Sequence, residues 1–267
     1  MLMWQQRGDS ARVRGGAAGG SEGRALPKGA ESNPRKGKRK LTSLRELDLE
    51  LNHLTSLPAE IWQLTTLWAL NLSDNQLTSV PAEIGRLTSL VSLDLWYNQL
   101  ESLPDVIGQL TELRVLDLGD NQLTSVPAEI GQLTSLECLY LGGNQLASLP
   151  AEVWQLTALK ELYLEGNKLT TLPTEIGQLT SLEWLHLDGN QLTSVPAEIG
   201  QLTSLRKLYL DGNQLTSLPA RIRELRADWL PRTSLAPRLP GDPCEVIMDD
   251  GVTFDEFPVP KNRLTLK

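Results

Sequence analysis

The sequence predicts an α/β solenoid, a repeating stack with short parallel strands on one side and short helical turns on the other. Three observations support this fold class. Eight asparagines recur every 23 residues with no change of register, and leucines surround each one in the pattern LxxLxLxxNxL. Aromatic residues make up only 5% of the 267 positions, so leucine has to fill the core. Together these features are typical of a repeat protein rather than of a mixed globular core.

The strand of each repeat is predicted from its LxL step. In Leu116-Asp117-Leu118 the two leucines point to one side and the residue between them points to the other. A strand this short is not stable alone, so each repeat must pair its backbone with the next. We therefore expect eight strands in one parallel sheet, with the residues between the leucines on its exposed, concave face.

The second half of each repeat predicts a short helical turn. In Pro127-Ala-Glu-Ile130 the proline stands where a helix can begin without its N–H, and Glu129 favours the positive helix end. Gly131 is expected to limit the helix to a turn or two. Ile130 and Leu133 should close the core from the convex side.

These repeats resemble the leucine-rich-repeat superfamily, and within it the intracellular 23-residue type of Ras-suppressor-like and LAP proteins. The resemblance is carried by the complete LxxLxLxxNxL pattern and by Leu123-Thr-Ser-Val-Pro-Ala-Glu-Ile130, which matches LTxLPxxI. It implies a horseshoe with a parallel concave sheet. It also implies a structural ladder in which the recurring asparagines bond backbone groups of their own and adjacent repeats: Asn52, Asn75, Asn98, Asn121, Asn144, Asn167, Asn190 and Asn213.

Residues 1–40 form a segment of different composition. They hold ten Lys/Arg and three Asp/Glu, whereas the rest of the chain holds fifteen against thirty. Few apolar residues follow Trp4, so we expect a disordered basic tail. Residues 34–40, PRKGKRK, are either a nuclear-localisation or nucleic-acid-binding patch or a solvated linker.

The first repeat has no recognisable cap. Residues 41–44, LTSL, match the closing letters of every later repeat, so the array begins at the tail of a missing one. An uncapped solenoid exposes an unpaired strand edge. Either the tail folds over this edge, or the chain self-associates through it, or the chain is part of a longer protein.

The leucine-rich-repeat domain is predicted to span residues 41–230 and to end in a capping helix at residues 221–226. Residues 231–267 should form an extension, in which a proline-rich loop precedes a hairpin around Asp249-Asp250-Gly251. A calcium loop there is the weaker alternative, because the acid spacing does not match one.

Two cysteines, and no apolar run long enough for a secretory signal or a membrane span, favour an intracellular compartment. We expect a cytoplasmic protein, with the nucleus as an alternative. Neither a membrane nor a cofactor is expected as a partner, and nucleic acid only through residues 1–40.

The concave face differs between repeats and is the candidate site. The residue between the strand leucines is acidic in the first half of the array and aromatic in the second. Tyr and Trp are favoured in binding sites, and acids among them would attract a basic partner. The alternative is a solvated face of strand-favouring residues. The predicted partner-binding residues are Asp94, Trp96, Asp117, Tyr140, Tyr163, Trp184, His186, Asp188, Tyr209 and Asp211.

No catalytic set is recognised. Cys138 and His186 both lie on predicted strands but two repeats apart, which leaves about 10 Å between their backbones. No metal-spaced cluster or phosphate loop is present either. The sequence therefore predicts a non-catalytic scaffold or adaptor in intracellular signalling, which holds a basic segment of a partner protein. The alternatives are a nuclear acidic solenoid that binds histones or other basic proteins, and the recognition part of a larger enzyme such as a ligase or kinase.

Overall fold

The computed structural model describes residues 3–7, 10–14 and 43–219. The chain divides into two compact units, Met1–Thr233 and Ser234–Lys267, and all the described residues lie in the first. The predicted capping helix and the C-terminal hairpin lie outside the described residues, as does the basic patch at residues 34–40.

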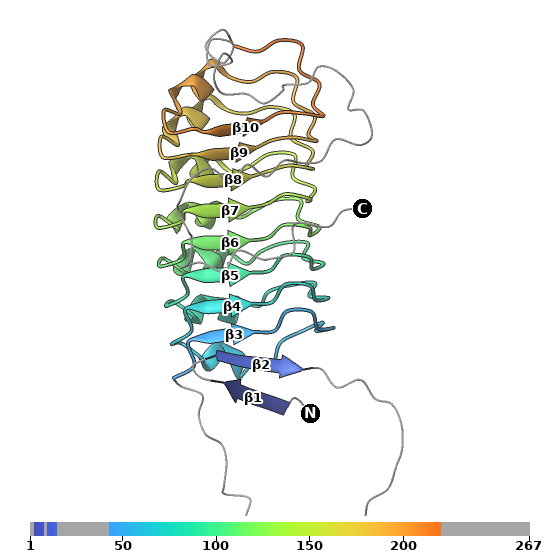
Figure 1. The fold of residues 1–267 in the computed structure, drawn as a ribbon, viewed down its shortest axis with the longest axis vertical. Coiled ribbons are helices and arrows are strands. Elements are labelled where there is room, and N and C mark those ends of the chain that lie inside the picture. Colours follow the sequence, from blue (N-terminus) through green and yellow to red (C-terminus); the bar gives the residue numbers. More distant parts are fainter. Residues whose placement is uncertain (1–2, 8–9, 15–42, 220–267) are drawn as a thin grey trace, which may run out of the picture. The chain divides into compact units, whose positions relative to one another are not determined.

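Eight of the strands in the sheet come from the repeats, one from each, and all pair in parallel (Figure 1). Leu47 pairs with Leu70, Leu70 with Leu93, and so on through Leu208, so the sheet keeps the 23-residue register of the sequence. The predicted parallel sheet is therefore confirmed. Its strands are β3 (Glu46–Asp48), β4 (Ala69–Asn71), β5 (Ser92–Asp94), β6 (Val115–Asp117), β7 (Cys138–Tyr140), β8 (Glu161–Tyr163), β9 (Trp184–His186) and β10 (Lys207–Tyr209).

Two further strands precede the repeats. β1 (Met3–Arg7) and β2 (Ser10–Arg14) form an antiparallel hairpin, and β2 pairs in parallel with β3. These ten residues are strands, whereas the composition of residues 1–40 predicted a disordered tail. Amino-acid composition predicts whether side chains can be buried in a core. Strand pairing uses backbone groups instead, and the open edge of β3 offers N–H and C=O groups with which any extended segment can pair. This matches the alternative in which the tail folds over the edge.

The helical turns of repeats one to seven are 3-10 helices on the other side of the sheet. Each proline from Pro81 to Pro196 that begins the motif is the extended residue before its helix, and each of these helices has five residues, within the turn or two that was expected. Gly131 has another role, because a Cβ there would lie 2.5 Å from the Cβ of Glu152 in the next turn. Glycine thus lets successive turns stack. The turns are η1 (Ile61–Gln63), η2 (Ala82–Arg86), η3 (Asp105–Gln109), η4 (Ala128–Gln132), η5 (Ala151–Gln155), η6 (Thr174–Gln178) and η7 (Ala197–Gln201).

A column of leucines joins the strands to the turns. Leu116 and Leu118 of β6 and its exit are fully buried, as are Ile130 and Leu133 on the convex side. This continuous core holds the strands in one layer, with the first and third side chains of each strand pointing away from it. That outward layer is the face on which a partner could lie.

The asparagines bond backbone groups across the repeat boundary. The side-chain amide of Asn144 donates to the carbonyls of Leu118 (2.9 Å) and Leu141 (3.1 Å), and its oxygen accepts from Leu123 N (2.9 Å). The same three contacts recur at each asparagine from Asn75 to Asn213. The loops after the strands are thereby held at a constant spacing.

Candidate protein-binding face

The open face of the sheet is formed by the third, fifth and seventh residues of each LxxLxLxxN segment. In repeat five these are Cys138, Tyr140 and Gly142. They point away from the leucine core because side chains alternate along a strand. The eighth residue of each segment follows them at the margin where the chain leaves the sheet.

Four rings at the fifth position form a continuous column on β7–β10. The centroids of Tyr140 and Tyr163 are 4.8 Å apart in an edge-to-face arrangement. His186 lies between Tyr163 and Tyr209, with centroids 3.9 and 4.2 Å away and ring planes within 29° of parallel. The strand spacing of about 4.8 Å brings such neighbours into contact. Both faces of the imidazole are thus covered, and the column meets a partner mainly through ring edges.

Tyr140 begins this column in a buried, acidic setting. Its hydroxyl donates to Glu161 Oε2 at 2.7 Å. Burial and the Glu161 carboxylate raise the pKa of Tyr140 well above its usual value. The same two causes raise the pKa of the Cys138 thiol to about 12, opposite to the shift that makes a cysteine nucleophilic.

A row of carboxylates at the seventh position runs beside the rings. Glu165 and Asp188 are half-buried and Asp211 is exposed. Asp188 Oδ1 lies 3.9 Å from His186 Nδ1. Trp184 lies at the third position of its repeat, where β9 begins, on the other side of the ring column, and pairs in register with Glu161 and Lys207. Predicted binding residues of the second half of the array therefore lie on neighbouring strands of one face.

The acids of the first half have a structural role that sequence reasoning missed. Asp94 Oδ1 accepts from Trp96 N at 2.9 Å, and Asp117 Oδ1 accepts from Gly119 N at 2.9 Å. Asp48 and Asn71 bond the amide two residues on in the same way. An Asp or Asn two residues before a chain turn was the available signal. Asp117 is 2% exposed, so it offers a partner almost no surface.

Trp96 is held in a cluster with Asp120, which is not among the predicted binding residues. Its indole N–H donates to Asp120 Oδ2 at 2.7 Å, and its ring centroid is 5.3 Å from that of Tyr97. A Cβ on Gly119 would come within 3.0 Å of the indole. Glycine at that position therefore leaves room for the tryptophan to extend over the next repeat.

A charge ladder borders the open face at the second position of repeats four to eight. Glu137 accepts from Arg114 at 2.5 Å and from Lys160 at 2.7 Å, and Arg206 pairs with Glu183 at 3.1 Å. Burial raises the pKa of Glu137, but the hydrogen bonds and charges of Lys160 and Arg114 outweigh it, so its pKa is lowered overall.

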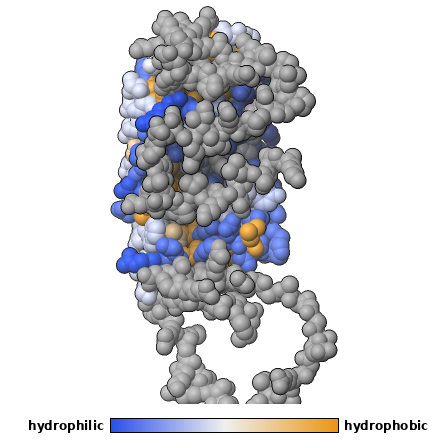
Figure 2. Space-filling view, in the orientation of Figure 1, coloured by the Kyte–Doolittle hydropathy of each residue, from blue (hydrophilic) through white to orange (hydrophobic). Residues whose placement is uncertain are grey.

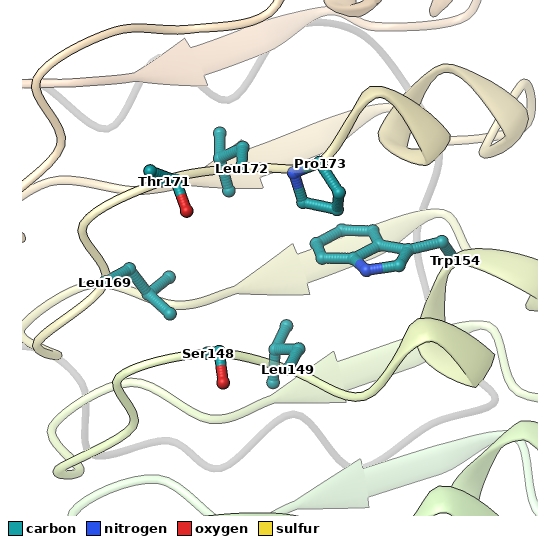
Figure 3. Close-up of a pocket in the computed structure, with 7 residues that line it drawn as sticks. All are labelled: Ser148, Leu149, Trp154, Leu169, Thr171, Leu172 and Pro173. Carbon is teal, nitrogen blue, oxygen red and sulfur yellow. The ribbon is translucent and has the colours of Figure 1, made fainter.

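One pocket lies away from the open face, between repeats five and six (Figure 3). It measures about 200 Å³ and is lined by Ser148, Leu149, Trp154, Leu169, Thr171, Leu172 and Pro173. Trp154 stands where most turns have glycine, and Figure 3 shows its indole between Leu149 and Pro173. The lining is apolar apart from two hydroxyls.

Across residues 3–7, 10–14 and 43–219, no group of three or more His, Cys, Asp or Glu side chains is arranged to hold a metal ion. Within the same described segments, no helix is long and apolar enough to cross a membrane.

Parallel strands in a 23-residue register, a leucine core and an asparagine ladder define a repeat solenoid with one open sheet face. The chain matches the family model described as a leucine-rich repeat region over residues 28–120, 105–211 and 151–227. It therefore belongs to the leucine-rich-repeat proteins, whose fold is that of a protein-interaction scaffold. No match was found among the curated proteins.

Solved structures of other leucine-rich-repeat proteins are similar. A leucine-rich-repeat protein of Leptospira interrogans is 50% identical with a TM-score of 0.67, over 69% of this chain and 47% of the other. The ectodomain of the receptor kinase GASSHO1/SCHENGEN3 from Arabidopsis thaliana is 39% identical with a TM-score of 0.64, over 68% and 23%. The plant peptide hormone receptor RGFR1 is 32% identical with a TM-score of 0.64, over 70% and 31%. This chain spans less than half the length of each.

Proposed function

We propose that the chain is a non-catalytic scaffold that holds a basic segment of a partner protein on its open face. One observation carries the proposal: the third, fifth and seventh positions of the eight repeats include nine carboxylates and one lysine, Lys207. A face so biased in charge attracts cationic segments and repels acidic ones.

The ring column supplies the other half of the interaction. Stacked Tyr163, His186 and Tyr209 are already ordered, so a partner that contacts their edges loses little side-chain entropy. Glu165, Asp188 and Asp211 run alongside and can pair with lysine or arginine side chains of the partner. The two plant receptors were solved with bound factors, CASPARIAN STRIP INTEGRITY FACTOR 2 and RGF2, and so provide examples of this fold as a receptor.

Affinity capture followed by titration of the captured protein tests the proposal. We expect Asp188→Lys/Asp211→Lys to weaken binding at least about tenfold at low salt, with the difference shrinking in 1 M salt, where charges are screened within about 3 Å. Tyr163→Ala/Trp184→Ala should weaken binding at both salt concentrations. Glu175→Lys, on the exposed side of η6, is the matched control. Equal binding by wild type and both open-face variants would refute the proposal.

The cellular compartment and the wider role are separate proposals. A cytoplasmic adaptor in signalling is supported by the cysteine-poor composition. The nuclear alternative depends on residues 34–40, and it fails if deleting residues 1–40 changes neither the nuclear fraction nor salt-sensitive nucleic-acid binding. The third proposal is that the chain is the substrate-recognition part of a larger enzyme. It predicts that the open reading frame of the full-length transcript also encodes a catalytic domain.

A further inference from the structure

The margin of the sheet has an unusual backbone. The eighth residue of every repeat has a positive φ, between 51° and 68°. Glycine adopts this region without strain, whereas a side chain with a Cβ is disfavoured there. The last four repeats have glycine at this position and the first four do not. The four non-glycine residues are Leu51, Asp74, Tyr97 and Asp120.

Two of these four side chains are large, apolar and exposed. Leu51 is 64% exposed and Tyr97 is 56% exposed, and they are the exposed large hydrophobic residues within the described part of the chain. Figure 2 shows an isolated hydrophobic patch on an otherwise hydrophilic margin near the end of the molecule that carries β3 and β4. A large apolar side chain that is mostly exposed and has a disfavoured backbone conformation gains little stability from burial in the fold.

Tyr97 belongs to an ordered platform. Trp96, bonded to Asp120, packs against the Tyr97 ring, and Gly119 leaves the space that the indole occupies. Asp120 in turn lies against Gly143, where a Cβ would overlap its carboxylate. Two glycines and a hydrogen bond thus present adjoining aromatic rings at the margin.

Carboxylates lie on both sides of this platform. Asp74 stands in the row between Leu51 and Tyr97, and Asp120 stands beyond Tyr97. The third, fifth, seventh and eighth positions of these four repeats contain neither lysine nor arginine. The chemistry that complements an aromatic platform flanked by acids is a guanidinium group, which stacks on aromatic rings and pairs with carboxylates.

We propose that Leu51, Asp74, Trp96, Tyr97 and Asp120 form a second docking surface, for a protein segment in which arginine adjoins an aliphatic or aromatic residue. The guanidinium lies on the Trp96–Tyr97 platform within reach of Asp120 or Asp74, and the adjoining apolar side chain contacts Leu51. This surface uses repeats one to four and none of the rings of the column on β7–β10. The chain is then a scaffold with two sites, each of which can bind a partner independently of the other.

Selection from a random peptide library displayed on phage tests this, with the full chain as target. Leu51→Gly/Tyr97→Gly removes both apolar side chains at positions where glycine suits the backbone, so the variant keeps its fold and its Tm stays equal or rises. Enriched peptides should contain arginine next to an apolar residue. In fluorescence polarisation they should bind this variant at least tenfold more weakly than wild type.

Two further variants separate the outcomes. Asp74→Asn/Asp120→Asn should also weaken binding, since asparagine tolerates positive φ and removes only the charge. Tyr163→Ala/Trp184→Ala should leave binding unchanged. Peptides that lose affinity only for the Tyr163/Trp184 variant would support the open-face proposal and overturn this one. Peptides that bind the Leu51/Tyr97 variant as well as wild type, a selection without arginine, or no enrichment would also overturn it.

Discussion

The exit of each strand is stabilised by two kinds of side chain, and both use backbone groups as partners. Asn144 accepts from the amide of Leu123 and donates to the carbonyls of Leu118 and Leu141, which also accept from the neighbouring ladder asparagines. In the first half of the array, Asp94 and Asp117 also bond the amide two residues on. In the second half that position is aromatic. The first half thus combines acidity with turn stability, whereas the second half exposes its acids at the seventh position.

Replacing one ladder asparagine tests its share of the stability. Asn144→Ala removes the partner of Leu123 N, whereas Leu118 O and Leu141 O still accept from the side-chain amides of Asn121 and Asn167. We expect the free energy of unfolding in urea to fall by about 1–3 kcal/mol, which is the cost of one buried group left without a partner. Asn213→Ala, half-buried in the last described repeat, should cost less. An equal loss in both variants would contradict this assignment.

Two glycines at the margin separate backbone strain from side-chain overlap. Gly166 has a φ of +64° and enough space for a Cβ, whose nearest contact would be 3.5 Å away, whereas a Cβ on Gly143 would overlap Asp120. Gly166→Ala should therefore destabilise by about 1–2 kcal/mol from strain alone. Gly143→Ala should cost about 1 kcal/mol more, because Asp120 must move and lose its bond to Trp96. Tryptophan fluorescence should change only in Gly143→Ala.

At the scale of the element, the strand and the turn of a repeat have different determinants. The strands match prediction because their period-two pattern is read directly from the leucines. The turns are 3-10 helices of three to five residues, and their glycines allow close contact with the next turn. η5 has Trp154 in place of that glycine, and a pocket of about 200 Å³ lies beside this side chain.

The charge ladder along the edge of the strands predicts a dependence on pH. The pKa of Glu137 is lowered in the folded chain, so its contribution to stability is present above the unfolded value of 4.5 and is lost as pH falls through the folded pKa. Glu137→Gln should lower stability at pH 7 by less than about 1 kcal/mol, since Arg114 and Lys160 are half exposed.

The difference between wild type and Glu137→Gln should shrink as pH falls below 4.5, measured as the free energy of unfolding in urea from pH 7 to pH 3. Glu112→Gln changes an exposed carboxylate and serves as the control. A difference that stays constant across this range would show that the ladder does not stabilise the fold.

At the scale of the whole molecule, stability is a sum over neighbouring repeats. The described repeats share one leucine core, and each strand pairs only with its neighbours. No single repeat is therefore indispensable, provided that the register is kept. The ring column lies in repeats five to eight and the second docking surface in repeats one to four of this one stack.

Deleting residues 121–143 joins Asp120 to Asn144 at equivalent positions and removes one whole repeat. We expect a folded protein with an unchanged circular-dichroism signal per residue and a lower Tm, because one repeat and one interface are lost. Deleting residues 121–132 removes half a repeat and shifts every later leucine out of register. That variant should not fold cooperatively, and a cooperative transition at the wild-type Tm would contradict the nearest-neighbour description.

The sequence by itself determined the repeat, its 23-residue register, the strand positions, the buried leucines and the asparagines. Each of these follows from a local pattern that recurs in every copy, so one repeat predicts the others. It also placed the acidic and aromatic residues on one face, since alternation along a strand is a local property.

Only the tertiary structure decided which of those residues present surface. Burial of Asp117 depends on its bond to Gly119 and on the repeats beside it, and the stacking of His186 depends on Tyr163 and Tyr209 in neighbouring strands. The pairing of β2 with β3 likewise carries no periodic signal. These features arise from contacts between repeats, whose energies depend on packing in three dimensions and not on the pattern within any one copy.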